Sequence, residues 1–143
     1  MKNTFIGLLI GLTVLFSINS HADIETDKFQ IMLAPAVAKN TAGYGVISNT
    51  GDSADTLLNI SCDGATVMLH KTEIKSNHAH MHHMKNIIIE ANSSLVLEPM
   101  SYHLMLSELS DVFFKDRETV TVVFEFKHAG IVEVEVPIVS VFY

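Results

Sequence analysis

The sequence predicts a single all-β domain, an antiparallel β-sandwich with Greek-key connections. Apolar residues either alternate with polar ones or form short runs, as they do in half-buried and buried strands. Glycine, proline, asparagine and aspartate separate these runs at short intervals, and such residues favour turns. No stretch after the N-terminal segment sustains a helical period, so helices are not expected.

The first half of the domain contains four predicted strands. Pro35 ends the first because proline has no backbone N–H to donate to a neighbouring strand. The turn residues Asn49, Gly51 and Asp52 close the second, and the tripeptide at residues 62–64 separates the third from the fourth. The predicted strands are residues 29–34, 43–49, 55–61 and 65–71, with a loop at 36–42.

The second half begins with a polar, histidine-rich stretch at residues 76–83, which interrupts the apolar pattern and is predicted as a loop. The strands predicted after it are residues 84–90, 94–97, 102–109, 119–126 and 132–141. The last two form a hairpin around residues 127–130.

The N-terminus has the pattern of a secretory signal peptide. Lys2 supplies the positive charge, residues 5–16 form a short apolar run, and Ser20 and Ala22 flank a cleavage site. The run is shorter than the roughly 20 residues needed to span a bilayer. We expect residues 1–22 to be removed and residues 23–143 to form the domain. No cysteine stands at the cleavage site, so the sequence does not indicate a lipid anchor.

Charge and cysteine content exclude several classes of function. The whole chain has a formal charge of −7, and loss of Lys2 with the signal makes it −8. An acidic surface argues against binding to nucleic acid or anionic lipid. Cys62 is the single cysteine, so an internal disulfide cannot form, and we interpret it as a half-buried strand residue.

Histidine and methionine gather between residues 70 and 105. His103 and Met105 are two apart in a predicted strand, so they share one face while Leu104 and Leu106 point into the core. His70 ends another predicted strand. Taken singly, a core methionine and a hydrogen-bonded histidine are the commoner roles. Strand ends and loops cluster at one rim of a sandwich, however, so His70, the loop from His78 to Met84 and His103 could meet there. Imidazole and thioether together favour Cu(I), whereas Zn(II) seldom takes methionine.

The remaining histidines of this stretch form either a second, looser site for Cu(II) or Zn(II) or a solvated loop. An extended backbone would put His78, His80 and His82 on one face, with Met81 and His83 on the other. Met84 is a candidate for the same secondary site, and chemistry alone does not decide between Met81 and Met84 as a ligand.

The sequence lacks the residues that electron transfer at a blue-copper centre, hydrolysis, nucleotide binding and thiol reduction require. A blue-copper centre needs a thiolate in a late loop, and the loop at residues 127–130 has His128 but no cysteine. No hydrolase triad, zinc-protease motif or phosphate-binding glycine loop is present, and a thiol reductant would need a second cysteine beside Cys62.

The chain resembles the periplasmic copper chaperones of the PCuAC type. That family carries His, ten residues, Met, twenty-one residues and His-x-Met, and His70, Met81, His103 and Met105 match every interval. Residues 41–52, 97–106 and 124–137 are similar too, so the resemblance covers nearly all of the domain. Met100 and Ser101 depart from the family, because glycines usually stand there.

The resemblance implies a cupredoxin-like sandwich that holds Cu(I) through those four residues and is not an enzyme. It further implies delivery by ligand exchange to the binuclear copper centre of cytochrome c oxidase in the periplasm of a Gram-negative type of cell, with a thioredoxin-like partner in some cases. We expect a monomer without stable membrane insertion. The alternatives are a periplasmic protein for copper storage or scavenging and a structural sandwich with an incidental histidine-rich loop.

Overall fold

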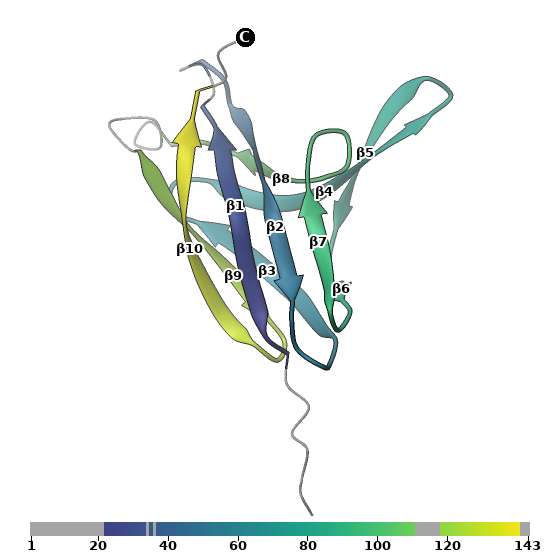
Figure 1. Cartoon of the computed structure of the whole chain (residues 1–143). Coiled ribbons are helices and arrows are strands. Elements are labelled where there is room, and N and C mark those ends of the chain that lie inside the picture. Colours follow the sequence, from purple (N-terminus) through teal and green to yellow (C-terminus); the bar gives the residue numbers. More distant parts are fainter. Residues whose placement is uncertain (1–21, 34, 36, 111–117, 141–143) are drawn as a thin grey trace, which may run out of the picture.

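The computed structural model describes residues 22–33, 35, 37–110 and 118–140, and this part of the chain is folded into strands (Figure 1). The strands are β1 (Ile24–Met32), β2 (Asn40–Asn49), β3 (Asp55–Cys62), β4 (Thr66–Lys75), β5 (His78–Met84), β6 (Ile87–Ile89), β7 (Ser93–Leu97), β8 (Tyr102–Ser107), β9 (Thr119–Phe126) and β10 (Gly130–Val139). Within these residues no helix is long and apolar enough to cross a membrane.

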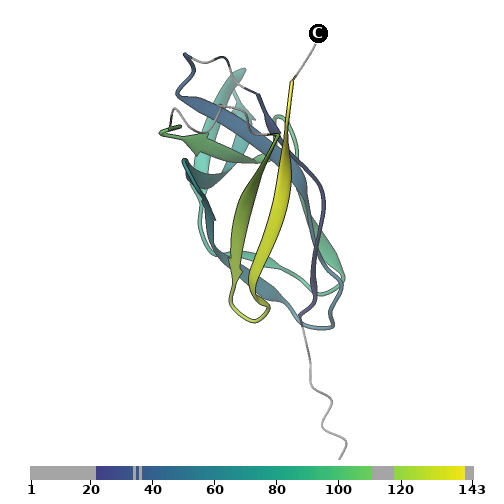
Figure 2. The ribbon, with the colours of Figure 1, turned by 90° about the vertical axis from the view of Figure 1, so that its left-hand side faces the viewer.

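The strands form two layers, which confirms the predicted all-β, cupredoxin-like sandwich. One layer has the order β5-β4-β8-β7-β2-β1, and β8 also pairs with β2. The other layer has the order β10-β9-β3-β6. A short parallel pairing of Ile31 with Ile138 joins β1 to β10. Figure 2 shows the β9–β10 hairpin in front of the other strands.

The core lies between the layers and is built by alternate residues of the strands. Phe29 of β1 and Phe124 of β9 are in ring contact across it, with centroids 5.2 Å apart. Burial of each such side chain contributes about 1.5–3 kcal/mol. The core also includes Ile31, Ile47, Leu57, Ile60, Leu69, Ile89, Leu97, Leu104, Leu106, Val120, Val122, Phe126 and Val136. Strands β4 and β8 are therefore anchored from their inner face.

Several predicted boundaries were wrong by a few residues. Strand β1 starts at Ile24 because the polar residues before Phe29 pair with β2, where Ile24 faces Asn49. Strand β4 does not end near His70 but continues to Lys75. The predicted strand 84–90 is reduced to β6, whereas β9 has the predicted bounds. The predictions for residues 1–21, 34, 36 and 141 lie outside the described residues.

The histidine-rich stretch predicted as a loop is strand β5. Its partner is β4, from Leu69 opposite Met84 to Lys75 opposite His78. Ser76 and Asn77 make the turn, with φ of 50° and 64°. Two consecutive left-handed residues are the geometry of a tight hairpin turn, and asparagine tolerates it well. This hairpin projects from the body of the sandwich (Figure 1).

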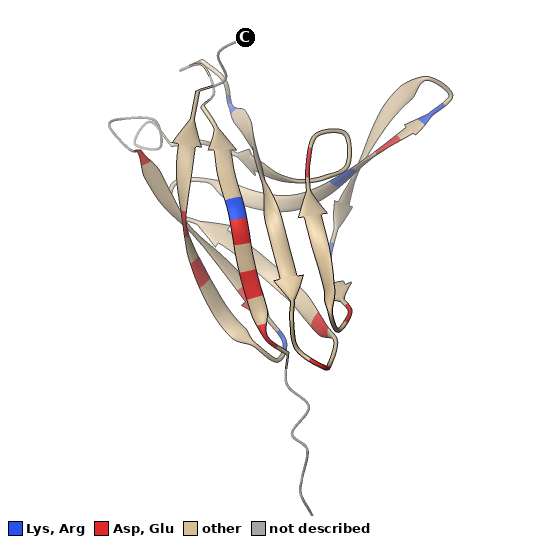
Figure 3. Cartoon of the chain, in the orientation of Figure 1, with Lys and Arg blue, Asp and Glu red and all other residues tan. Residues whose placement is uncertain are grey.

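We call residues 73–82 the arm. Strand β4 pairs with β8 as far as Lys71, and Thr72 still donates its backbone N–H to the carbonyl oxygen of Ser101. From Glu73 to the turn, the strand pairings found among the described residues are those between β4 and β5. All residues of β5 except Met84 are exposed. Figure 3 marks both basic and acidic positions on this hairpin, whereas β1 and β10 carry mainly acidic positions. The arm is thus a solvated edge of the sheet rather than part of its packed core.

Candidate metal centre

His70 lies at the middle of three adjacent strands. Its register partner on β8 is His103, and its register partner on β5 is His83. The ring centroids of His70 and His103 are 5.9 Å apart, and those of His70 and His83 are 5.7 Å apart, both edge to face. The sheet therefore carries a row of three imidazoles across β5, β4 and β8.

The row faces away from the core. Leu104 and Leu106 are 1% and 0% exposed on the inner face of β8, as the alternation predicted. His103 and Met105 take the opposite face because side chains alternate along a strand. Met105 is half-buried, and it is a diagonal neighbour of His70, two residues from His103. Such diagonal neighbours are about 7–8 Å apart, within reach of a long side chain.

Met81 is the other diagonal neighbour of His70. It pairs with Thr72 at the base of the arm, and it lies two residues from His83 on the same face of β5. Its side chain is 59% exposed. The four residues predicted as ligands therefore share one face of β4, β5 and β8, with Met81 and Met105 on opposite sides of His70. They lie on the paired strands β5, β4 and β8 at one edge of the sheet, not at a rim of loops as the sequence had led us to expect.

His70 is a candidate ligand whose surroundings favour the neutral imidazole. Its Nδ1 atom is buried and has no hydrogen-bond partner among the described residues. Burial, with the neighbouring imidazoles of His103 and His83, lowers the pKa of His70 below its ordinary value. A neutral imidazole is the form that binds metal. An unpaired buried nitrogen costs free energy, and coordination would remove that cost.

His103 is oriented by the backbone. It is 9% exposed, and its Nδ1 lies 3.1 Å from the carbonyl oxygen of Ser101. A carbonyl can only accept, so Nδ1 carries the proton and donates it to Ser101, which assigns the lone pair to Nε2. Hydrogen bonds of this kind fix the tautomer and ring orientation of metal-binding histidines.

The secondary candidates are divided between two faces. His83 belongs to the same face as His70, whereas His78, His80 and His82 lie on the opposite face of β5. This is the division expected for an extended backbone. Met84 packs against the core instead. The position of His83 beside His70 could have been found from the sequence only through the turn at residues 76–77, which sets the register.

The face with His78, His80 and His82 also carries the charges of β4. Glu73 lies opposite His80, and its carboxylate is 2.8 Å from Lys75, 3.3 Å from Lys71 and 3.9 Å from His82. Hydrogen bonds from Lys75 and Lys71 lower the pKa of Glu73 to about 2. In the described chain, no three side chains of the His, Cys, Asp and Glu types are placed to hold a metal ion. A purely nitrogen and oxygen site is therefore not preassembled there.

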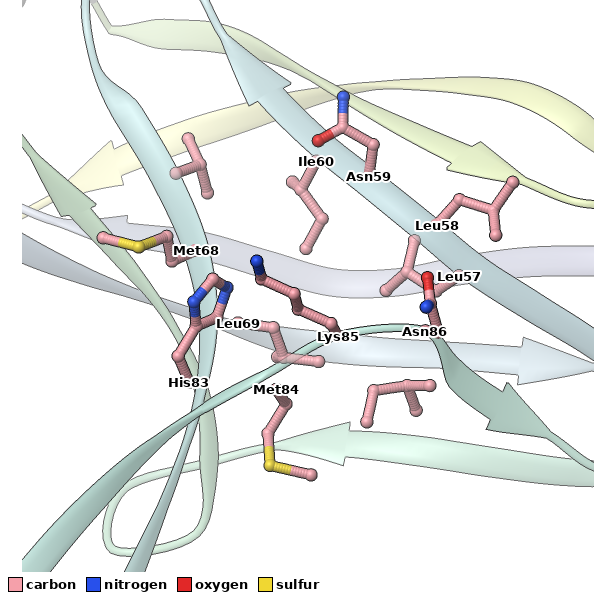
Figure 4. Close-up of a pocket in the computed structure, with 12 residues that line it drawn as sticks. Leu57, Leu58, Asn59, Ile60, Met68, Leu69, His83, Met84, Lys85 and Asn86 are labelled. Atoms are coloured by element: carbon pink, nitrogen blue, oxygen red, sulfur yellow. The ribbon is translucent and has the colours of Figure 1, made fainter.

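A cleft of about 380 Å³ opens beside the row of imidazoles, where the chain leaves β5 and crosses to β6 (Figure 4). Met68 and His83 contribute to its wall together with Lys85. The rest of its lining is Leu57, Leu58, Asn59, Ile60, Val67, Leu69, Met84, Asn86 and Ile87. The centre is thus bordered by solvent-accessible space on the side of Met68.

Comparison with models of known protein families assigns the chain to a family. The family model LpqE-like matches residues 24–138, which is most of the described domain. The chain belongs to the LpqE-like family. This assignment, with the structural likeness below, confirms the resemblance to the PCuAC type. No curated protein matches the chain.

Several solved structures share the fold. The copper-bound PCuAC domain from PmoF2 is 17% identical with a TM-score of 0.66, and the match covers 85% of this chain and 99% of that one. The apo form of the same domain is 16% identical with a TM-score of 0.67, covering 82% and 90%. Apo-DR1885 from Deinococcus radiodurans is 20% identical with a TM-score of 0.61, covering 99% and 98%. At these identities the likeness shows the fold alone.

Proposed function

We propose that this protein is an exported Cu(I)-binding chaperone whose metal ligands are His70, Met81, His103 and Met105. The observation that carries the proposal is the strand register. It places these four side chains on one face, with His70 directly opposite His103 and diagonal to both methionines. Residues separated by up to 35 positions in the sequence become neighbours in this way.

The donor set selects the metal. Two neutral imidazoles and two thioethers carry no negative charge, and soft thioether ligands suit Cu(I). The charged side chains of β4, Lys71, Glu73 and Lys75, lie on the other face of the hairpin. Zn(II) and Ca²⁺ would require thiolate, imidazole or oxygen ligands in greater number.

The protein's similarity to known domains supports the same function. The PCuAC domain from PmoF2, which has the same fold, was solved with copper bound. The lipoprotein description of the LpqE-like family agrees with export, and we place the protein in the periplasm.

Delivery follows from the same chemistry. Release of Cu(I) from two imidazoles and two thioethers is a ligand exchange in which the carrier itself gains or loses no proton or electron. The receiver we propose is the binuclear copper centre of cytochrome c oxidase, with a thioredoxin-like assembly partner in some cases. A monomeric carrier would suit this role, since the exposed arm carries one of the ligands.

Competition for Cu(I) against a chromophoric chelator tests the binding site. We expect His103→Ala to weaken binding by at least about 30-fold, which is about 2 kcal/mol. His128→Ala is the matched control, because this histidine lies on the β9–β10 turn, away from the proposed ligands. Equal affinity of the wild type and His103→Ala would contradict the proposed site.

Copper transfer tests the delivery step separately. The Cu(I)-loaded protein should pass its metal to the apo form of the soluble oxidase domain that carries the binuclear centre. Retention of copper by the carrier, with normal oxidase assembly in a deletion strain at limiting copper, would favour storage over delivery.

Storage or scavenging is the second candidate, and the arm favours it. His78, His80 and His82 are exposed imidazoles on one face, where they could take Cu(II) or Zn(II). Copper stoichiometry decides between the candidates. A carrier binds one tight equivalent, whereas a storage protein would bind further equivalents that the triple alanine variant of these histidines would lose.

A further inference from the structure

Met68 is a third thioether on the face of the proposed copper site. It lies two residues before His70 on β4 and therefore on the same side of the sheet. Its register partner on β8 is Met105. Directly opposed residues of antiparallel strands have Cβ atoms about 4.5–5.5 Å apart, which is closer than the diagonal distance from His70 to Met81. The spacing of the sequence motif does not include this residue.

Together with three of the proposed ligands, Met68 forms a compact rectangle. His70 opposes His103, and Met68 opposes Met105, on two strands that pair over six positions. The inner faces of both strands are fixed by buried leucines, Leu69 on β4 and Leu104 on β8. Two imidazoles and two thioethers therefore stand at the corners of a rigid patch, without any contribution from the arm.

Met81 differs from Met68 in the exposure of its side chain and in the strand pairing around it. It is 59% exposed and sits on an edge strand that, in the described part of the chain, pairs with β4 alone. Met68 is half-buried and borders the cleft beside His83 (Figure 4). Both methionines flank His70 on its own face, one toward the body of the sandwich and the other toward the arm.

We propose that Met68 and Met81 are alternative fourth ligands of one Cu(I) ion held by His70, His103 and Met105. This rests on the proposed function and specifies how the metal is handed over. The bond from copper to the Met81 sulfur breaks as the bond to the Met68 sulfur forms. Both donors are neutral thioethers, so charge, protonation and oxidation state stay the same. The arm is then free to approach a receiver while copper keeps four ligands.

The ordinary role of a half-buried methionine is to fill space. Met84 provides the comparison, because it packs against the core and belongs to the same hairpin. Leucine nearly conserves the volume of methionine and removes only the sulfur, at a cost usually below about 1.5 kcal/mol. Met68→Leu, Met81→Leu and Met84→Leu therefore separate ligation from packing.

The experiment is a double-substitution cycle in Cu(I) affinity, measured by chelator competition. Each of Met68→Leu and Met81→Leu should weaken binding by at most about tenfold, because the other methionine takes its place. The double variant should lose more than about a thousandfold, so that the loss exceeds the product of the single effects. Met84→Leu should bind as the wild type does.

Copper-edge X-ray absorption on the single variants gives a second readout. Met81→Leu should retain two sulfur ligands, and the double variant should retain one. A double variant with the affinity of Met81→Leu, or one sulfur ligand in Met81→Leu, would overturn the role of Met68 while leaving the copper chaperone in place. A wild type without Cu(I) affinity would overturn both proposals.

Discussion

Asp55 is a buried carboxylate whose removal should weaken the fold without touching the copper site. It is 1% exposed at the start of β3. Its Oδ1 accepts hydrogen bonds from the backbone N–H groups of Thr56 at 2.7 Å and His128 at 2.9 Å, and its Oδ2 accepts one from Ala129 at 2.8 Å. These bonds hold the β9–β10 turn against the neighbouring strand.

The substitution Asp55→Asn keeps the shape but places an amide N–H₂ where one oxygen was. The amide oxygen can still accept from Thr56 and His128, while the N–H₂ group opposes the N–H of Ala129. One charge-assisted bond is lost and a buried donor is left unpaired, for a total cost of about 2–3 kcal/mol. For a domain of this size that is a fall in melting temperature of roughly 8 °C.

The loss of unfolding free energy caused by Asp55→Asn should become smaller at acidic pH. Burial raises the pKa of Asp55, but the backbone N–H groups of Ala129, His128 and Thr56 outweigh it and lower the pKa below its ordinary value. The stabilisation is therefore present above the unfolded pKa of about 4 and is lost as the pH falls through the lower folded value.

Denaturant unfolding of wild type and Asp55→Asn from pH 7 to pH 3 measures this difference. The gap in unfolding free energy should be constant from pH 7 to pH 5 and narrow below pH 4, while the Cu(I) affinity at pH 7 stays the same. A gap that widens in acid, or a variant as stable as the wild type at pH 7, would refute the reasoning.

Two further predictions concern the core beside Gly45 and the histidines of the arm. Gly45→Ala would place a Cβ 2.6–2.8 Å from the ring atoms of Phe29, so we expect thermal unfolding to show destabilisation of about 1–3 kcal/mol. An unchanged melting temperature would show that the ring moves freely. Simultaneous replacement of His78, His80 and His82 by alanine should leave the first Cu(I) equivalent unchanged in chelator competition and abolish weaker Cu(II) binding, because these side chains lie on the opposite face from His70.

The sequence was sufficient to predict strands and their inner faces where one face of the strand is buried in the core. The alternation around Leu104 and Leu106 correctly placed His103 and Met105 on the outer face, because a strand with one buried face must keep a period of two. The turn residues between apolar runs likewise located most strands. Strand β1 was partly missed, since its first residues are polar and are held by pairing with β2 instead of by burial.

The arm could not be predicted in the same way. Residues 78–83 are exposed on both faces, so no apolar alternation marks them as a strand. Their register comes from the turn at Ser76 and Asn77, which puts Lys75 opposite His78 and therefore His70 opposite His83. The motif spacing predicted that His70 and Met81 are ligands of one site, whereas the positions of His83 and Met68 beside His70 emerge only from strand pairing.

Copper-edge X-ray absorption of the complex with one equivalent of Cu(I) tests the central claim most directly, because it counts the ligand atoms around the metal. The outer face of β4, β5 and β8 predicts two imidazole nitrogens and two thioether sulfurs, with a loss of one nitrogen in His103→Ala. A copper ion without sulfur ligands, or a spectrum that His103→Ala leaves unchanged, would contradict it.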